Sequence, residues 1–268
     1  MSKKRIDLLL VERGLVESRA LAQRLVMAGQ VRANGEVVGK PSDAVLETVP
    51  IEVESGPPFV SRGGEKLAGA LAAFPAQVAG KVCADVGAST GGFTDCLLQN
   101  GAAKVYAIDV GHGILHWKLR NDPRVVVMER TNARHVEHLL EPVHLVTVDA
   151  SFISLKILLP VLRAWFVPST PGFLSDVGEG EVIALIKPQF EAGRKEAARG
   201  EGVIRDPKVH RAVLEEVLGF AQAEGFGVRG AIRSPLEGPK GNVEFLAWLG
   251  FPGKGEVDLQ GLISPIVG

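Results

Sequence analysis

Three aspartates stand at or next to the ends of apolar runs that have the length of buried strands. They are Asp85, Asp109 and Asp149. Taken singly, each could be a cap or a surface group, but the carboxyl ends of parallel strands meet at one edge of a sheet. Three acids there would face one crevice and would suit a ligand with several polar groups. Asp109 follows Asp85 at about the separation at which an acid accepts hydrogen bonds from ribose hydroxyls.

A glycine-rich turn, Gly87 to Gly92, follows Asp85 and leads into a predicted helix over 91–99. Glycines let a backbone approach a ligand closely, and a helix N-terminus offers free N–H groups. The spacing matches neither the G-x-G-x-x-G pattern of dinucleotide sites nor a phosphate-binding G-x-x-x-x-G-K-[ST] loop. Asp85 would repel a pyrophosphate, but it suits the cationic amino group of a methionine-derived ligand, either directly or through water. We therefore predict an S-adenosylmethionine site in which Asn132–Arg134 reach the adenine, formed by Asp85, Gly87, Ser89, Thr90, Gly91, Gly92, Phe93, Asp109, Asn132, Ala133 and Arg134.

Two more ionisable side chains lie in apolar surroundings. Lys187 ends a predicted buried strand, which Pro188 stops, and Glu244 lies in the first half of another. A lysine at a strand end often only extends its ammonium to solvent. A buried glutamate, however, needs a cation or a donor, and Lys187 and Lys66 are the candidates. A lysine held among acids can act as a base or as an electrostatic stabiliser.

These residues need a sheet to hold them, and from Lys81 onward strand and helix patterns alternate. Strands are predicted over 82–86, 104–109, 125–129, 144–149, 181–187, 226–233 and 243–249. Helices are predicted over 67–74, 91–99, 114–120, 152–166 and 206–223, and a loop over 168–180. Near-continuous apolar strands indicate a parallel sheet covered on both faces, and right-handed crossovers then give a doubly wound α/β fold of about seven strands.

The first 57 residues have a different pattern, that of a small α+β module. Helices are predicted over 5–13 and 18–28, a hairpin over 31–38 with Asn34–Gly35 at its turn, and a last strand over 49–53. Up to Lys40 the module carries eight lysines and arginines against four acids, and the rest of it carries acids alone. Such asymmetry favours one positive face that binds phosphate backbones, although a solvated charged surface is an equal alternative. The stiff Gly56-Pro57-Pro58 break sets the domain boundaries at 1–57, a linker over 58–66, and 67–268.

Bulk properties narrow the class of protein. The chain has 268 residues, a net charge of −1 and two cysteines, Cys83 and Cys96, both in apolar segments. Two buried free thiols fit a reducing compartment, and neither cysteine has metal-ligand spacing. The sequence contains neither a signal-peptide core nor an apolar run long enough to span a membrane. We expect a cytoplasmic protein without a metal or membrane partner, and the oligomeric state stays open.

The N-terminal module resembles the small RNA-binding domain of ribosomal protein S-four. The likeness rests on Arg5-Ile-Asp-x-Leu-Leu and on Ser18-Arg-x-x-Ala-x-x-Leu-Val-x-x-Gly-x-Val-x-x-Asn-Gly35. It implies that the second helix and the following loop face structured RNA. The RNA-binding residues expected from it and from the flanking basic positions are Lys3, Lys4, Arg5, Arg19, Arg24, Arg32 and Arg62.

The whole chain from residue 3 to about 250 resembles the TlyA family, often labelled hemolysin A. These proteins join an S-four-type module to an FtsJ-like methyltransferase domain. The motifs are Ser61-Arg-Gly-Gly-x-Lys-Leu67, Asp85-Val-Gly-Ala-Ser-Thr-Gly-Gly-Phe-Thr-Asp95, Asp149-x-Ser-Phe-Ile-Ser154, Lys187-Pro-Gln-Phe-Glu-Ala-Gly193 and Gly238-Pro-Lys-Gly-Asn-Val-Glu-Phe245. The resemblance implies S-adenosylmethionine-dependent 2′-O-methylation of ribosomal RNA, at cytidine, with ribosomal RNA or ribosomal subunits as partners.

The same resemblance implies a catalytic tetrad of Lys66, Asp149, Lys187 and Glu244. In it, Lys187 would orient the 2′-hydroxyl and take up or stabilise its proton, and the two acids would position the lysines. Three other functions are weighed against this one. A membrane-active hemolysin would need an amphipathic or spanning segment, a non-catalytic RNA-binding protein need not keep all four tetrad residue types, and an oxidoreductase would need a different glycine spacing.

Overall fold

The computed structural model describes residues 2–54, 56–166, 179–193, 201–253 and 257–267. The chain divides into two compact units, Met1–Pro58 and Phe59–Gly268. The loop predicted over 168–180 lies outside the described residues up to residue 178.

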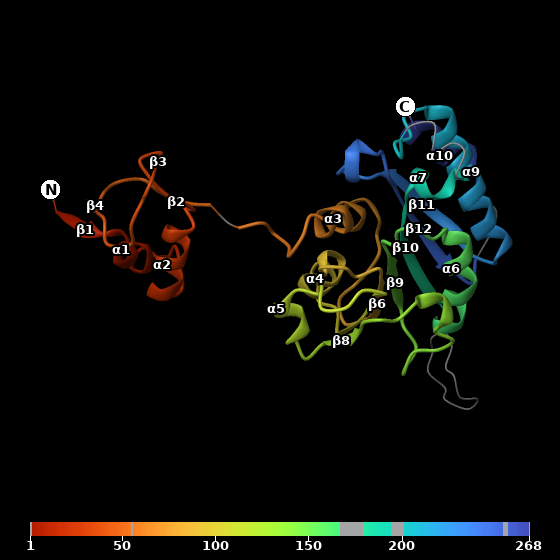
Figure 1. Cartoon of the computed structure of the whole chain (residues 1–268), viewed down its shortest axis with the longest axis horizontal. Coiled ribbons are helices and arrows are strands. Elements are labelled where there is room, and N and C mark those ends of the chain that lie inside the picture. Colours follow the sequence, from red (N-terminus) through yellow and green to blue (C-terminus); the bar gives the residue numbers. More distant parts are fainter. Residues whose placement is uncertain (1, 55, 167–178, 194–200, 254–256, 268) are drawn as a thin grey trace. The chain divides into compact units, whose positions relative to one another are not determined.

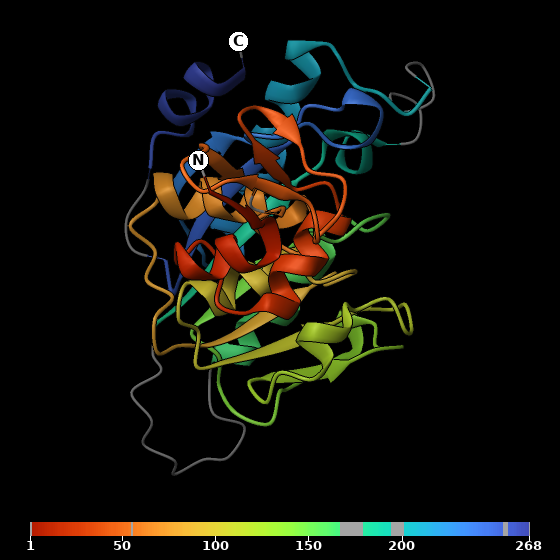
Figure 2. The ribbon, with the colours of Figure 1, turned by 90° about the vertical axis from the view of Figure 1, so that its left-hand side faces the viewer.

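The first unit packs two helices over short strands, and Figure 2 shows these helices, in red, side by side. Ser18 begins the second helix, because its Oγ accepts a hydrogen bond from the backbone N–H of Leu21. The predicted hairpin turn is confirmed, with Asn34 and Gly35 at φ of 54° and 82°. The elements are β1 (Lys3–Arg5), α1 (Ile6–Glu12), α2 (Arg19–Met27), β2 (Val31–Ala33), β3 (Glu36–Val37), β4 (Ala44–Leu46) and β5 (Ile51–Val53).

Two details of this unit differ from the prediction. The first helix begins at Ile6 instead of Arg5, because Lys3–Arg5 pair in an antiparallel ladder with β4, a strand that was not predicted. Three residues of mixed burial give too little pattern to identify a strand.

The core of the unit is formed by Ile6, Leu10, Val16, Ala22, Val26, Val31 and Val38.

The second unit is a seven-stranded sheet with helices on both faces (Figure 1). Its strand order is β11-β12-β10-β9-β6-β7-β8. All seven predicted strands are confirmed, as β6 (Val82–Val86), β7 (Lys104–Ile108), β8 (Val125–Met128), β9 (Leu145–Val148), β10 (Gly180–Ile186), β11 (Gly227–Arg233) and β12 (Phe245–Phe251). Its helices are α3 (Gly63–Ala73), α4 (Gly92–Gln99), α5 (Trp117–Arg120), α6 (Leu155–Leu162), α7 (Pro188–Glu191), α9 (Pro207–Ala223) and α10 (Leu259–Val267), with single 3-10 turns at η1 (Ala133–His135), η2 (Arg163–Phe166) and η3 (Pro239–Gly241).

Alternate residues of each strand feed two separate cores. Ala84 and Val86 pack with residues of α6, α9 and α10 on one face. Cys83 packs with residues of α3, α4 and α5 on the other. Burial of its sulfur raises the pKa of Cys83 to about 12, and burial likewise raises that of Cys96 to about 12. Both thiols are therefore protonated at neutral pH.

The predicted parallel sheet contains one antiparallel strand. Among the described strands, β12 alone runs against its neighbours, β10 and β11. Residues 234–244 between β11 and β12 contain no crossover helix, only η3, so an antiparallel partner is the result. The first residue of β12 therefore lies at the edge where the parallel strands end, and Glu244 arrives there too.

Three helix boundaries also changed. α3 begins at Gly63 instead of residue 67, so Lys66 belongs to its first turns. The helix predicted over 152–166 divides into α6 and η2, and the one over 114–120 shortens to α5. Neither α7 nor α10 was predicted. Within the described residues, no helix combines the length and the apolar character needed to cross a membrane.

Candidate active site

Two lysine–carboxylate pairs meet at the carboxyl edge of the sheet. Lys187 Nζ lies 2.6 Å from Asp149 Oδ1, and Lys66 Nζ lies 2.5 Å from Glu244 Oε2. Glu244 is 1% exposed, and both lysines are buried. The structure thus brings together all four residues of the expected tetrad. Buried opposite charges at this distance hold each other firmly, since removing either partner leaves an uncompensated charge.

Each of the four comes from a different element, and each element ends or begins at this edge. Asp149 follows β9, and Lys187 follows β10 and precedes Pro188, the first residue of α7. Glu244 precedes β12, and Lys66 lies on α3. The cross-strand pairing of Ile186 with Phe245 places Lys187 and Glu244 next to each other.

Lys187 is held by more than its carboxylate. Its Nζ donates to Ser151 Oγ at 3.0 Å and to the backbone oxygen of Asp149 at 3.3 Å. The ring of Phe190 lies below the same nitrogen, 5.7 Å away at its centroid. The ammonium is therefore fixed in orientation.

A cavity of about 560 Å³ opens beside Asp149. Its volume falls within the range of small-molecule sites. Apolar side chains that sequence reasoning missed, Val86, Ile108, Val110, Ile114 and Ile157, form much of its wall. Of the predicted cofactor residues it is lined by Gly87, Ser89, Asp109, Asn132, Ala133 and Arg134.

A smaller hollow of about 120 Å³ adjoins the glycine turn. It shares Gly87, Ser89 and Asp149 with the larger cavity and adds the predicted Thr90, Gly92 and Phe93. At Gly87, φ is 83°, and an added Cβ would stand 2.8 Å from the backbone oxygen of Asp149. Glycine is required there because the turn runs directly against the backbone of Asp149, whose carboxylate pairs with Lys187.

Backbone N–H groups fix two polar side chains of the larger cavity, Asp109 and Asn132. Asp109 accepts hydrogen bonds from the N–H of Ser89 at 2.8 Å and of Gly111 at 2.7 Å. Asn132 Oδ1 caps the N–H of Arg134 at 3.2 Å. These contacts fix both polar side chains, and each keeps further capacity to bond a ribose or a base.

Two predicted cofactor residues do not line either cavity. Asp85 is wholly buried; its carboxylate accepts hydrogen bonds from Thr94 Oγ1 at 2.7 Å and Thr147 Oγ1 at 3.2 Å. Its carboxylate is held inside the fold against Thr94 of α4, so Asp85 lies behind the cavity wall, and a contact with a ligand amino group through water stays a prediction. At Gly91, φ is 98° and a Cβ would stand 2.2 Å from Leu119, so this glycine serves the packing of α5.

A loop and a turn support the site through residues that, Asp149 and Lys187 apart, were quoted in the sequence only as parts of motifs. The loop spans residues 149–155 and the turn 187–191. Glu191 accepts from Ser154 Oγ at 2.6 Å and from the N–H of Leu155 at 2.8 Å. Phe152, at φ 63° and 89% exposed, leans on Phe190 with ring centroids 4.8 Å apart. An exposed aromatic in a left-handed conformation is unusual, and it stands on the cavity wall.

Some of the expected RNA-binding residues have hydrogen-bond or ion-pair partners within the described chain, and others do not. Asp7, fully buried, accepts from Arg5, Arg19 and Gln23, and the hydrogen bond from Arg5 holds the pKa of Asp7 well below its usual range. Both arginines stay largely exposed on this anchor. Lys4 pairs with Glu12 and Arg32 with Glu54. Exposed side chains for which the described residues offer no hydrogen bond or ion pair are Lys3, Arg24 and Arg62.

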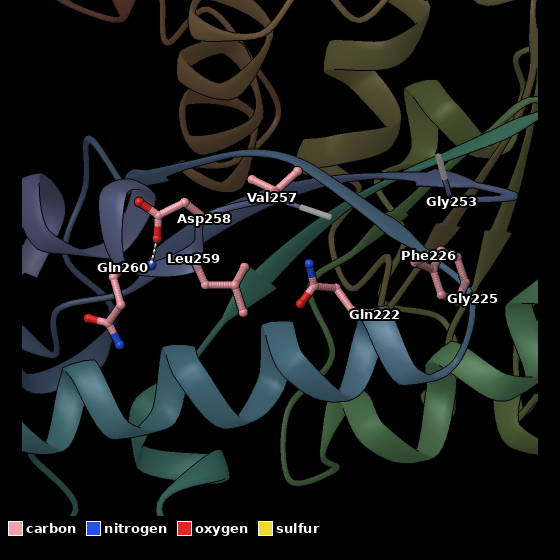
Figure 3. Close-up of a pocket in the computed structure, with 8 residues that line it drawn as sticks. All are labelled: Gln222, Gly225, Phe226, Gly253, Val257, Asp258, Leu259 and Gln260. Carbon is pink, nitrogen blue, oxygen red and sulfur yellow. Dashed lines mark hydrogen bonds between the residues drawn. The ribbon is translucent and has the colours of Figure 1, made fainter. Parts of the chain in front are cut away.

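A second cavity, of about 540 Å³, lies at the opposite edge of the sheet (Figure 3). Gln222, Val257 and Leu259 line it, and the Asp258 carboxylate there accepts from the N–H of Gln260 at 3.0 Å. Among the described residues that line it there is no lysine, arginine or histidine. Elsewhere in the described chain, no three histidine, cysteine or acidic side chains are grouped to hold a metal ion.

Comparison with known proteins identifies the class. Residues 59–251 match the model of the FtsJ-like methyltransferase family, and residues 4–49 match that of the S4 domain. The chain therefore belongs to the FtsJ-like methyltransferase family, with an S4 domain at its N-terminus.

Particular relatives cover nearly the whole chain. The 16S/23S rRNA (cytidine-2′-O)-methyltransferase TlyA of Mycobacterium tuberculosis is 47% identical over 92% of this chain and 90% of its own. A candidate rRNA methyltransferase of Bacillus subtilis, YqxC, is 48% identical over 95% and 88%. A solved structure described as a candidate hemolysin of Streptococcus thermophilus is 41% identical, with a TM-score of 0.70 over 99% of this chain and 96% of that one.

The burial of Asp85 predicts a pH-dependent stability. Burial raises the pKa of Asp85 to about 7, from an ordinary 3.8. Between pH 3.8 and about 7, Asp85 holds a proton in the folded protein that it has lost in the unfolded chain. Protonated Asp85 therefore adds to the free energy of unfolding at low pH, and this contribution is lost as the pH rises through about 7. In Asp85→Asn this loss is absent, and the stability of the variant relative to wild type should grow by up to about 1.4 kcal/mol per pH unit between about pH 5 and 7.

Urea unfolding followed by tryptophan fluorescence measures this, since Trp117, Trp165 and Trp248 all lie in the second unit. A stability difference that stays constant from pH 5 to 8 would show that Asp85 is ionised throughout.

Proposed function

We propose that this chain transfers a methyl group from S-adenosylmethionine to ribose 2′-hydroxyls of ribosomal RNA, with cytidine as the target nucleoside. The observation that carries the proposal is the position of Asp149. This residue lines both parts of the cavity and at the same time pairs with Lys187. A ligand site and a proton-handling lysine therefore meet at one carboxylate. The identity of the substrate and of the target nucleoside is inferred from the TlyA relative named above.

The lining of the cavity fits S-adenosylmethionine. Apolar walls suit an adenine, and Asp109 beside them suits ribose hydroxyls. The smaller hollow at the glycine turn offers backbone groups to the methionine portion. The cofactor, when bound, supplies an electrophilic methyl group.

The tetrad then acts on the substrate. A 2′-hydroxyl is a weak nucleophile and has to lose its proton as it is methylated. Lys187 orients this hydroxyl. Its Nζ first gives up one proton to solvent and then takes up the hydroxyl proton as the methyl group is transferred, while Asp149 holds Lys187 in place. Glu244 does the same for Lys66, whose ammonium adds positive charge beside the developing alkoxide.

The substrate base and the RNA backbone have separate surfaces. The exposed ring of Phe152 on the cavity wall is suited to stack against a nucleobase. The N-terminal unit adds Arg5 and Arg19, fixed on Asp7 and exposed, as contacts to phosphates. We place the reaction in the cytoplasm, where ribosomal subunits are available as substrates.

Methyl transfer is tested directly with methyl-labelled S-adenosylmethionine and purified small and large ribosomal subunits. Label should enter RNA in at least one subunit, at a ribose that resists alkaline cleavage. Absence of label from both subunits, with cofactor binding demonstrated by calorimetry, would exclude the proposed activity.

The role of Lys187 is tested by Lys187→Ala. Transfer should fall by at least a thousandfold because the proton has no acceptor, while the dissociation constant for S-adenosylmethionine stays within about threefold, since Lys187 does not line the cavity. Loss of cofactor binding instead would make Lys187 a cofactor ligand.

The RNA-binding role of the N-terminal unit is tested by Arg19→Ala combined with Arg24→Ala. The slope of log affinity for ribosomal subunits against log salt concentration should fall by roughly 1 for each arginine. Arg163→Ala with Arg229→Ala is the matched control, because those arginines lie towards the opposite edge of the sheet and pair with Glu224 and Glu181. Equal slopes for both double variants would remove the N-terminal unit from the RNA interface.

A further inference from the structure

Two lysines and two acids in one small region can pair in more than one way. Register places Lys187 beside Glu244 across β10 and β12, yet Lys187 pairs with Asp149 and leaves Glu244 to Lys66. If Lys187 turned to Glu244 instead, its ammonium would leave the carboxylate that lines the cavity. Something in the site has to select the observed pairing.

Gln189 is placed to make this selection. Its Nε2 donates to Glu244 Oε1 at 3.2 Å, while Lys66 holds Oε2 of the same carboxylate. Oε1 is also covered by Gly238, where an added Cβ would stand 2.1 Å from it. The oxygen of Glu244 that Lys66 does not use is thus occupied by an uncharged donor and enclosed by backbone.

The hydrogen bonds of Gln189 itself do not explain why an amide occupies this position. Its Oε1 is the one buried side-chain nitrogen or oxygen in the described part of the chain that has no hydrogen-bond partner. Such an atom is costly in a folded protein and needs an explanation. A methionine or leucine would fill the space without this cost. The feature that only the amide provides is the N–H that it donates to Glu244.

We propose that Gln189 is a positioning residue that fixes the pairing of the tetrad. By occupying Glu244 Oε1 with a neutral donor, it keeps Lys187 on Asp149, at the cavity, and Lys66 on Glu244. The consequence for catalysis rests on the proposed methyl transfer; the consequence for the ion pairs does not. Gln189 acts through Glu244 and touches neither cofactor nor substrate in this role.

The first test is Gln189→Met, which keeps the length of the side chain and removes the donor. In single-turnover assays on ribosomal subunits, the rate should fall 10- to 100-fold, with dissociation constants for S-adenosylmethionine and subunits within twofold of wild type. Gln222→Met is the matched control, since Gln222 is also half-buried and lines the cavity of Figure 3. A rate for Gln189→Met within twofold of wild type would overturn the proposal.

A double-mutant cycle separates positioning from general structural damage. If Gln189 acts through Glu244, Gln189→Met added to Glu244→Gln should slow the reaction less than threefold further. Rate losses that multiply in full would mean that Gln189 acts elsewhere. Should Gln189→Met unfold the protein, Gln189→Asn takes its place, because the shorter amide cannot reach Glu244.

The third measurement does not depend on activity. In full-length protein labelled with ¹⁵N-lysine, the Nζ signals of Lys187 and Lys66, assigned with Lys187→Arg and Lys66→Arg, should both shift in Gln189→Met and stay in place in Gln222→Met. Unchanged signals would overturn the proposal even if the reaction slowed. Wild-type protein that fails to methylate either subunit would refute the proposed function and leave this measurement to decide on Gln189.

Discussion

The site depends on the cost of placing charged side chains out of water. Glu244 is almost completely buried, and Lys66, which pairs with it, is also a buried residue. Either charge alone would strongly destabilise the fold. The element that carries Lys66 and the element that carries Glu244 therefore have to end at the same place. The reversed direction of β12 meets this demand, because it brings residue 244 to the edge where β9 and β10 deliver Asp149 and Lys187.

The same demand explains why the second unit resembles a ligand-binding α/β fold and still differs from a dinucleotide site. A turn of small residues lies against the backbone of Asp149, so the cavity and the ion pairs share a wall. A shift of that turn would move the carboxylate as well. The cavity wall and the carboxylate that pairs with Lys187 are therefore connected through the close backbone approach at Gly87.

Sequence patterns predicted what depends on local periodicity. Apolar runs located all seven strands, and their ends located Asp109, Asp149 and Lys187 at one edge. The complete burial of Asp85 was not predicted, because a position near a strand end does not reveal which face the side chain takes; hydrogen bonds from Thr147 and Thr94 hold it inside the fold. The contact between Lys66 and Glu244 joins residues 178 positions apart, so the need of a buried glutamate for a cation left Lys66 and Lys187 as equal candidates, and only the resemblance to a family placed all four residues in one tetrad. The role of Gln189 depends on a single hydrogen bond, which no pattern of residue types encodes.

The two cysteines give the protein a practical property. Cys83 and Cys96 are both buried, and burial raises the pKa of each to about 12, so thiol reagents at neutral pH meet no reactive native sulfur. If one cysteine were introduced on the surface of each unit, these two cysteines would be the targets of a maleimide dye. The distance between the S4 domain and the methyltransferase domain, and its change when RNA is added, can thus be followed by fluorescence energy transfer without first removing any native residue.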